Sequence, residues 1–182
     1  GNKSNARERF GLLPNKQYIG TAGGLYKDKG VEVIYQAWEK LKHEMPNVHL
    51  VLAGPYQPDY PPPEEERVHY LGSLAHHEIS TLFQALDLGI ISILDTPFGR
   101  YCFPQKAYEM LACDLPVVVA NIGEMSYLFR DSPQVLFQTG NANDLASKIQ
   151  QQLQSPQQQS IVVEDWATII ERLEPMITAL KF

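Results

Sequence analysis

Residues 104–119 read PQKAYEMLACDLPVVV and combine a short helix with a buried strand. The first part follows a proline and carries Lys106 and Glu109 three residues apart, on neighbouring positions of a helix surface. The second part, from Pro116 onward, is a run of β-branched apolar residues, which is typical of a parallel strand covered on both faces. A lysine at a helix N-terminus attracts phosphate, and a carboxylate nearby accepts hydrogen bonds from sugar hydroxyls. The pattern therefore suits a ligand that contains both groups, such as a nucleotide-sugar.

Strands and helices alternate along the rest of the chain. The hydrophobic pattern predicts strands at 18–22, 48–53, 68–71, 88–94, 116–120 and 135–137, and helices at 30–44, 79–86, 104–114, 124–129, 145–153 and 164–180. Pro175 is expected to kink the last helix or to divide it in two. Alternation at this spacing predicts an α/β fold with a Rossmann-like, doubly wound parallel sheet of about six strands and flanking helices. We interpret residues 1–16 as a linker or tag remnant and residues 17–182 as one domain.

Composition excludes several classes of function. The 182 residues carry a net charge of −6, which argues against a nucleic-acid-binding protein. No apolar run reaches the ~20 residues of a membrane span, and no signal peptide is visible at the N-terminus. The two cysteines, Cys102 and Cys113, are too few for a disulfide scaffold or metal site, and the five histidines show no metal-binding spacing. A reducing, cytoplasmic compartment fits best.

Loops at the carboxyl ends of the strands are the expected place for a ligand in such a sheet. These loops are predicted at 22–30, 54–56, 72–75, 95–104 and 121–125. Gly23 and Gly24 would let the backbone approach a phosphate closely. Lys29 lies at a helix start, where a cation is mildly unfavourable unless an anion is nearby, so it is a candidate phosphate ligand. Asp95 and Thr96, which follow the central strand, are candidates for the edge of the site.

Several motifs occur together in the order expected for one family. Gly23-Gly24-Leu25, Lys29-Gly30, VHLVLAG at 48–54, VHYLGSL at 68–74 and PQKAYEMLACDLPVVVA at 104–120 resemble the C-terminal domain of group 1 (family four) glycosyltransferases of the GT-B fold. The resemblance covers most of the chain, from about residue 7 to the helix that contains Trp166. It implies a domain that binds a nucleoside-diphosphate sugar. It also implies an N-terminal acceptor domain that is absent from this chain.

The resemblance assigns roles to individual residues. Lys29 and Glu109 are expected to take part in catalysis, Lys29 by holding the donor diphosphate and Glu109 by binding the ribose hydroxyls. Further donor-binding residues are expected at Gly23, Gly24, Gly72, Ser73, Leu74, Arg100, Tyr101 and Lys106, with Gly54 and Pro55 beside them. The family pattern EX7E places a glutamate where this chain has Tyr101, although Pro104, Lys106 and Glu109 resemble subgroups with a proline–lysine–glutamate motif. In the family this first acid helps to hold the donor sugar, so Tyr101 replaces an expected sugar ligand.

The resemblance also implies the reaction and its partners. We expect transfer of a sugar from a UDP- or GDP-sugar, with retention of configuration and without a cofactor or metal, in polysaccharide or glycoconjugate biosynthesis. The whole enzyme is expected in the cytoplasm, with peripheral association at the inner face of a membrane as a further option.

Two alternatives stay open at this point. One is a non-catalytic nucleotide-binding or interaction module of flavodoxin-like fold, although the acids of a receiver domain are not found after the first strand. The other is a glycosyltransferase domain that has lost donor binding, for which Tyr101 is the warning. Dinucleotide-dependent dehydrogenases and P-loop NTPases are disfavoured because their glycine-rich motifs are absent.

Overall fold

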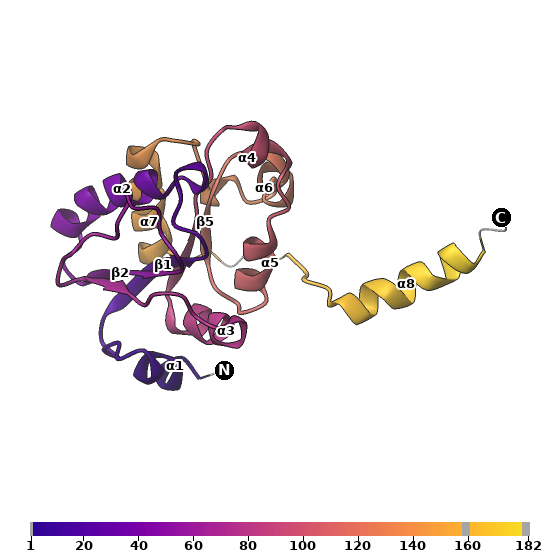
Figure 1. Ribbon diagram of the computed structural model, residues 1–182, viewed down its shortest axis with the longest axis horizontal. Helices are drawn as coiled ribbons and strands as arrows, with labels where there is room; N and C mark the ends of the chain where they lie inside the picture. The colour runs from indigo at the N-terminus through magenta and orange to yellow at the C-terminus, as the bar shows by residue number, and fades with distance from the viewer. Residues whose placement is uncertain (1, 158–160, 180–182) are drawn as a thin grey trace.

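The computed structural model describes residues 2–157 and 161–179, in which six parallel strands form one sheet in the order β3-β2-β1-β4-β5-β6 (Figure 1). The strands are β1 (Gln17–Ala22), β2 (Val48–Ala53), β3 (Val68–Tyr70), β4 (Leu88–Ile91), β5 (Val117–Ala120) and β6 (Leu136–Phe137). Every residue of β2, β4 and β5 is buried, which is why these strands read as continuous apolar runs. The predicted Rossmann-like, doubly wound sheet is therefore confirmed.

Helices cover both faces of the sheet. They are α1 (Lys3–Arg9), η1 (Lys27–Lys29), α2 (Val31–Glu44), α3 (His76–Ala85), α4 (Pro97–Tyr101), α5 (Gln105–Leu111), α6 (Gly123–Leu128), η2 (Pro133–Val135), α7 (Ala142–Gln154) and α8 (Trp166–Thr178). The helices α2 and α7 pack against each other on one face, and α3 and α5 lie on the other (Figure 1). Near the carboxyl ends of the strands, α4 contacts α6 and η1. This arrangement leaves the switch point between β1 and β4 accessible from the carboxyl edge.

Large side chains fill the space between the sheet and its helices. Trp38 of α2 is 1% exposed, and Tyr18, Phe83, Phe129 and Phe137 are equally well buried. Burial of such a side chain stabilises a fold by roughly 1.5–3 kcal/mol. The buried Trp38 indole still has a hydrogen-bond partner, because its Nε1 donates to Glu65 Oε2 at 3.2 Å. The core thus holds the sheet rigidly below the edge at which the loops gather.

The segment predicted as a linker contains a helix that belongs to the domain. Arg7 of α1 is 7% exposed, and its guanidinium pairs with Asp87 Oδ2 at 2.6 Å. The same side chain donates to the carbonyls of Ala85 and Pro14 and lies 5.1 Å from the centre of the Tyr18 ring. The linker interpretation is therefore wrong for residues 3–9, because one buried arginine fixes the helix to the sheet and to α3.

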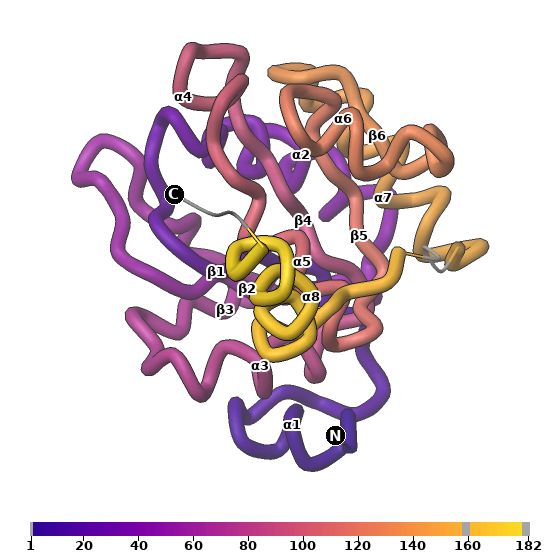
Figure 2. The backbone as a smooth tube through the Cα atoms, turned by 90° about the vertical axis from the view of Figure 1, so that its right-hand side faces the viewer, coloured from indigo at the N-terminus to yellow at the C-terminus, as the bar shows by residue number. Residues whose placement is uncertain are grey.

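Helix α8 projects from the domain, and the view along the molecule in Figure 2 shows it end-on in front of α3 and α5. No residue of α8 is buried. Pro175 lies inside this single helix and does not divide it, contrary to one of the two expectations for it. Proline removes only the bond from its own nitrogen to the carbonyl four residues earlier, and the helix continues past it, with the Ala179 amide donating to the Pro175 carbonyl at 3.1 Å. Among the described residues, no helix is long and apolar enough to cross a membrane.

Candidate functional site

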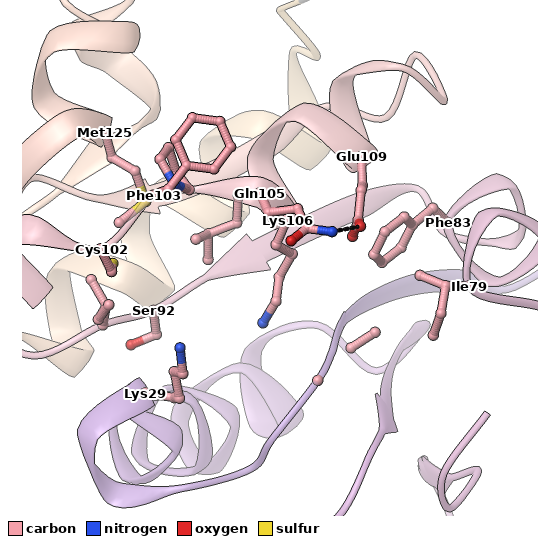
Figure 3. Close-up of a pocket in the computed structure, with 15 residues that line it drawn as sticks. Lys29, Ile79, Phe83, Ser92, Cys102, Phe103, Gln105, Lys106, Glu109 and Met125 are labelled. Atoms are coloured by element: carbon pink, nitrogen blue, oxygen red, sulfur yellow. Dashed lines mark hydrogen bonds between the residues drawn. The ribbon is translucent and has the colours of Figure 1, made fainter. Parts of the chain in front are cut away.

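A cavity of about 330 Å³ opens at the carboxyl ends of β1 and β4, where the strand order reverses. Its lining comes from the loop after β1, the end of β4, and α5 with the residues that precede it: Ala22, Gly23, Lys29, Ile79, Phe83, Ile91, Ser92, Ile93, Cys102, Phe103, Pro104, Gln105, Lys106, Glu109 and Met125. Lys29, Lys106 and Glu109 are the three charged side chains among them (Figure 3). The structure thus brings Lys29 together with Lys106 and Glu109, which lie far from it in the sequence.

Lys29 is held at the cavity by a close contact between η1 and the end of β4. Gly30 adopts φ +66°, and a Cβ at this position would clash with Ser92 Oγ. The Ser92 hydroxyl donates to the Gly30 carbonyl at 3.0 Å. The Lys29 amine lies 4.2 Å from the centre of the Phe98 ring, within the range of a cation–π contact. Gly30 is therefore needed for the placement of Lys29, which gives the Lys-Gly pair a physical reason.

Lys106 enters the same cavity from the first turn of α5. Figure 3 shows its amine and that of Lys29 directed toward the same space. The amine donates to Thr21 Oγ1 at 3.2 Å. Burial, and then the positive charge of Lys29, lower the pKa of Lys106 to about 8, while Glu109 acts in the other direction. Two cations that face one cavity favour an anionic ligand, because an anion would offset both the repulsion and the lost hydration.

Glu109 lies one turn further along α5 and is partly buried. One of its carboxylate oxygens accepts from Gln105 Nε2 at 2.8 Å (Figure 3). The ring of Phe83 and the side chain of Ile79 lie beside it in the lining. A carboxylate in this position can accept hydrogen bonds from hydroxyl groups of a ligand that also reaches the two lysines.

The glycine loops pack tightly against one another at this edge. The Gly23 amide donates to the Ala53 carbonyl at 2.9 Å, and the Gly54 amide donates to the Gly72 carbonyl at 2.7 Å. A Cβ on Gly54, which has φ +125°, would clash with the Gly23 carbonyl. Gly23 thus lines the cavity with its amide already paired, so a contact from this amide to phosphate is not available in this arrangement. The two glycines serve chiefly to let the strand ends approach.

Other predicted residues lie outside the lining of the cavity. These are Gly24, Gly54, Pro55, Gly72, Ser73, Leu74, Asp95, Thr96, Arg100 and Tyr101. Arg100 is exposed and pairs with Asp95, another predicted candidate, at 2.5 Å, which holds the pKa of the Asp95 carboxyl below its usual range. Tyr101 is 88% exposed at the end of α4. The five-residue helix α4, which the sequence pattern does not reveal, turns both Arg100 and Tyr101 away from the cavity.

Three uncharged residues that contact Lys29, Gly30 or Lys106 were missed, of which Ser92 itself lines the cavity. Thr21 accepts a hydrogen bond from the Lys106 amine, and Ser92 donates one to the Gly30 carbonyl. The ring of Phe98 makes a cation–π contact with the Lys29 amine. The sequence pattern predicts that Ser92 lies inside a strand at 88–94, because apolar residues flank it on both sides. In the structure β4 ends at Ile91, so Ser92 lies just after the strand. A hydroxyl residue near the carboxyl end of a buried strand is the signal that could have found both Thr21 and Ser92.

Metal-binding clusters are absent from the part of the chain that the structure describes, where no group of three or more histidines, cysteines or acids could hold an ion. His49 and His69 do approach each other, with Nδ1 and Nε2 2.9 Å apart, but they lie as a stacked pair against Tyr18. Burial lowers the pKa of both imidazoles, and the neighbouring His69 adds to this effect on His49. The pair is a structural feature of β2 and β3.

Comparison with known proteins gives the chain a family. A family model described as Glycosyl transferases group 1 matches residues 16–155. The chain belongs to this family. The resemblance inferred from the motifs and the prediction of a transferase are thereby confirmed.

The chain spans less than a third of a curated relative that it matches and about half of a structural neighbour. D-inositol 3-phosphate glycosyltransferase of Mycobacterium marinum is 27% identical over 143 residues, which cover 72% of this chain and 29% of that protein. Anabaena Alr3699/HepE, solved in complex with UDP and glucose, has a TM-score of 0.75 at 24% identity, covering 98% of this chain and 52% of that one. The C-terminal domain of LpcC, a group 1 glycosyltransferase from Francisella tularensis, has a TM-score of 0.69 at 17% identity, with 94% and 92% covered. The two structures show the shared fold.

Proposed function

We propose that this chain is the donor-binding domain of a glycosyltransferase and that the cavity at the carboxyl ends of β1 and β4 binds a nucleoside-diphosphate sugar. The observation that carries the proposal is the convergence of the Lys29 and Lys106 amines on one cavity with Glu109 at its side. The lysines would hold the diphosphate, and Glu109 would accept hydrogen bonds from the ribose hydroxyls. The structurally similar Anabaena protein was solved in complex with UDP and glucose, which supports a uridine nucleotide as the first ligand to test.

The proposed chemistry follows from where negative charge develops. As the bond between the sugar and the diphosphate breaks, charge accumulates on the leaving phosphate oxygens. Two lysine amines already fixed beside those oxygens would stabilise this charge without reorganisation. We propose further that the two amines remove the need for a metal ion and that transfer proceeds with retention, in a whole enzyme that can associate peripherally with a membrane. Acceptor binding is assigned to a separate N-terminal domain, and therefore no general base is named here.

The residues of the cavity account for binding of the nucleotide and not of the sugar. Tyr101, which stands where the family pattern has a sugar-holding glutamate, points to solvent and contributes no group to the cavity. The proposal therefore assigns the diphosphate and ribose to named residues and assigns none to the sugar. A domain that binds UDP but gains no affinity from an attached glucose would be the degenerate form of this family.

Calorimetric titration with UDP, GDP and ADP tests the proposal, with Lys27 providing the control. Lys27 and Lys29 belong to the same turn, but Lys27 is exposed and outside the cavity. Because hydrogen bonds to charged groups contribute about 1.5–3 kcal/mol, we expect Lys29→Ala to weaken UDP binding by roughly 10- to 100-fold. Lys27→Ala should leave the affinity unchanged, and addition of EDTA should have no effect. Absence of binding by all three nucleotides at millimolar concentration would refute the donor site.

A further inference from the structure

Lys106 differs from the other paired lysines of the domain in the partner of its amine. Lys3 and Lys42 pair with carboxylates at 2.8–2.9 Å. The Lys106 amine donates instead to a neutral hydroxyl, Thr21 Oγ1, at 3.2 Å. Within residues 2–157 and 161–179, no carboxylate oxygen lies within 4.0 Å of this amine. The amine is thus fixed in position without an ion-pair contact to a carboxylate of the described residues.

Thr21 is well suited to fix this position. It lies at the carboxyl end of the central strand β1 and is 3% exposed. A β-branched side chain on a buried strand has little rotational freedom, so its hydroxyl defines one place for the amine. Substitution by valine would keep the shape of the side chain and remove only the hydrogen bond.

Besides β1, four parts of the chain contribute charged or polar groups around Lys106: η1, α5, the segment between α4 and α5, and the residues after β4. Lys29 of η1 carries the same charge, and Glu109 lies one turn further along α5. Cys102, in the segment between α4 and α5, Gln105 at the start of α5 and the Ser92 hydroxyl after β4 are the other polar groups of the lining. Burial, and then the positive charge of Lys29, lower the pKa of Lys106, so its amine gives up its proton more readily than an exposed lysine does.

We propose that Thr21 is a positioning residue that holds the Lys106 amine for the donor diphosphate, and that this amine takes up a proton when the diphosphate binds at alkaline pH. The inference rests on the proposed donor-binding function and adds to it a positioning residue and a dependence of binding on pH. A bound diphosphate stabilises the charged amine, so it raises the pKa of Lys106 above its value of about 8 in the free domain. Binding at pH 7 therefore needs no proton uptake by this amine, whereas binding above pH 8 does. The affinity must then fall as the pH rises through 8.

The test is calorimetric titration of the 182-residue chain with UDP between pH 7 and pH 9, in two buffers of different ionisation enthalpy. The difference between the wild type and Lys106→Met isolates this lysine, because the titration of UDP itself is common to both. We expect the wild type to take up a proton at pH 8.5 to 9 and to lose affinity by several-fold over this range. The Lys106→Met variant should bind more weakly at pH 7 and should lack the uptake.

The variants of Thr21 separate positioning from a general structural role. At pH 7, Thr21→Val should weaken UDP binding by about three- to tenfold, as expected for one hydrogen bond, and should move the fall in affinity to lower pH. Thr21→Ser, which keeps the hydroxyl, should restore both properties. Because the wild type and Lys106→Met measure the proton uptake without any change at Thr21, poor folding of Thr21→Val would not remove the test.

The outcomes distinguish this inference from the function on which it rests. Failure of the wild type to bind nucleotide at any pH would overturn the donor site and the inference together. Binding at pH 7 with no proton uptake at pH 9, or a Thr21→Val variant with the pH profile of the wild type, would overturn the inference and leave the donor site intact.

Discussion

Glu109 is the residue on which recognition of the ribose depends in this account. Its carboxylate faces the cavity and is engaged there by Gln105. The Glu109→Gln variant keeps the size of the side chain and removes its charge, so the hydrogen bonds to ribose hydroxyls should weaken and UDP binding should fall by roughly tenfold. Calorimetry on the variant measures this directly.

Glu32 of α2 provides a matched control for that substitution. It also accepts a hydrogen bond from a glutamine four positions away on its helix, at 3.3 Å, but it is exposed and outside the cavity. The Glu32→Gln variant should bind UDP like the wild type. Equal losses in the two variants, or none in either, would place the ribose elsewhere.

Single residues show what the sequence can and cannot predict. Lys29, Lys106 and Glu109 were predicted from their place at a helix start or in the family motif, and the structure places all three in the lining of one cavity, while their roles stay predictions. Thr21 was missed because a threonine in a β-rich pattern is ordinary, and its value depends on an amine 85 positions away. Arg100 and Tyr101 were predicted from their place in a motif, yet their orientation depends on the short helix that carries them.

The elements were predictable where burial alone determines them. The strand at 48–53 has the predicted limits, because all six of its residues are buried. Helix α1 could not be predicted from a polar, linker-like sequence, since its attachment depends on the contact between Arg7 and Asp87. The periodicity of a sequence predicts which residues face a core, but it does not predict which two distant charged residues form an ion pair.

Helix α1 leads to a prediction about stability at the scale of elements. Arg7→Gln removes a buried partner of Asp87 and leaves the carbonyls of Ala85 and Pro14 without their donor, so we expect the free energy of unfolding to fall by about 3 kcal/mol. Arg9→Gln on the same helix breaks only the exposed pair with Glu78 and should cost less than about 1 kcal/mol. Urea unfolding of both variants measures the difference. Similar small losses in the two would mean that α1 does not belong to the cooperative unit.

At the scale of the whole molecule, the doubly wound sheet accounts for the place of the site. The reversal of strand order between β1 and β4 leaves a crevice at the carboxyl edge, and the family's Lys-Gly and proline–lysine–glutamate segments lie on its two sides. The chain spans 52% of the Anabaena structure and 29% of the Mycobacterium marinum protein. Donor binding is therefore the part of the proposed function to test on this chain.

A crystal structure of this chain with UDP is the most direct test of the central claim. The account predicts phosphate oxygens within about 3.2 Å of the amines of both Lys29 and Lys106, and ribose hydroxyls at the carboxylate of Glu109. A diphosphate bound outside the cavity, for example at exposed Arg100, with both lysine amines free of contact, would contradict it.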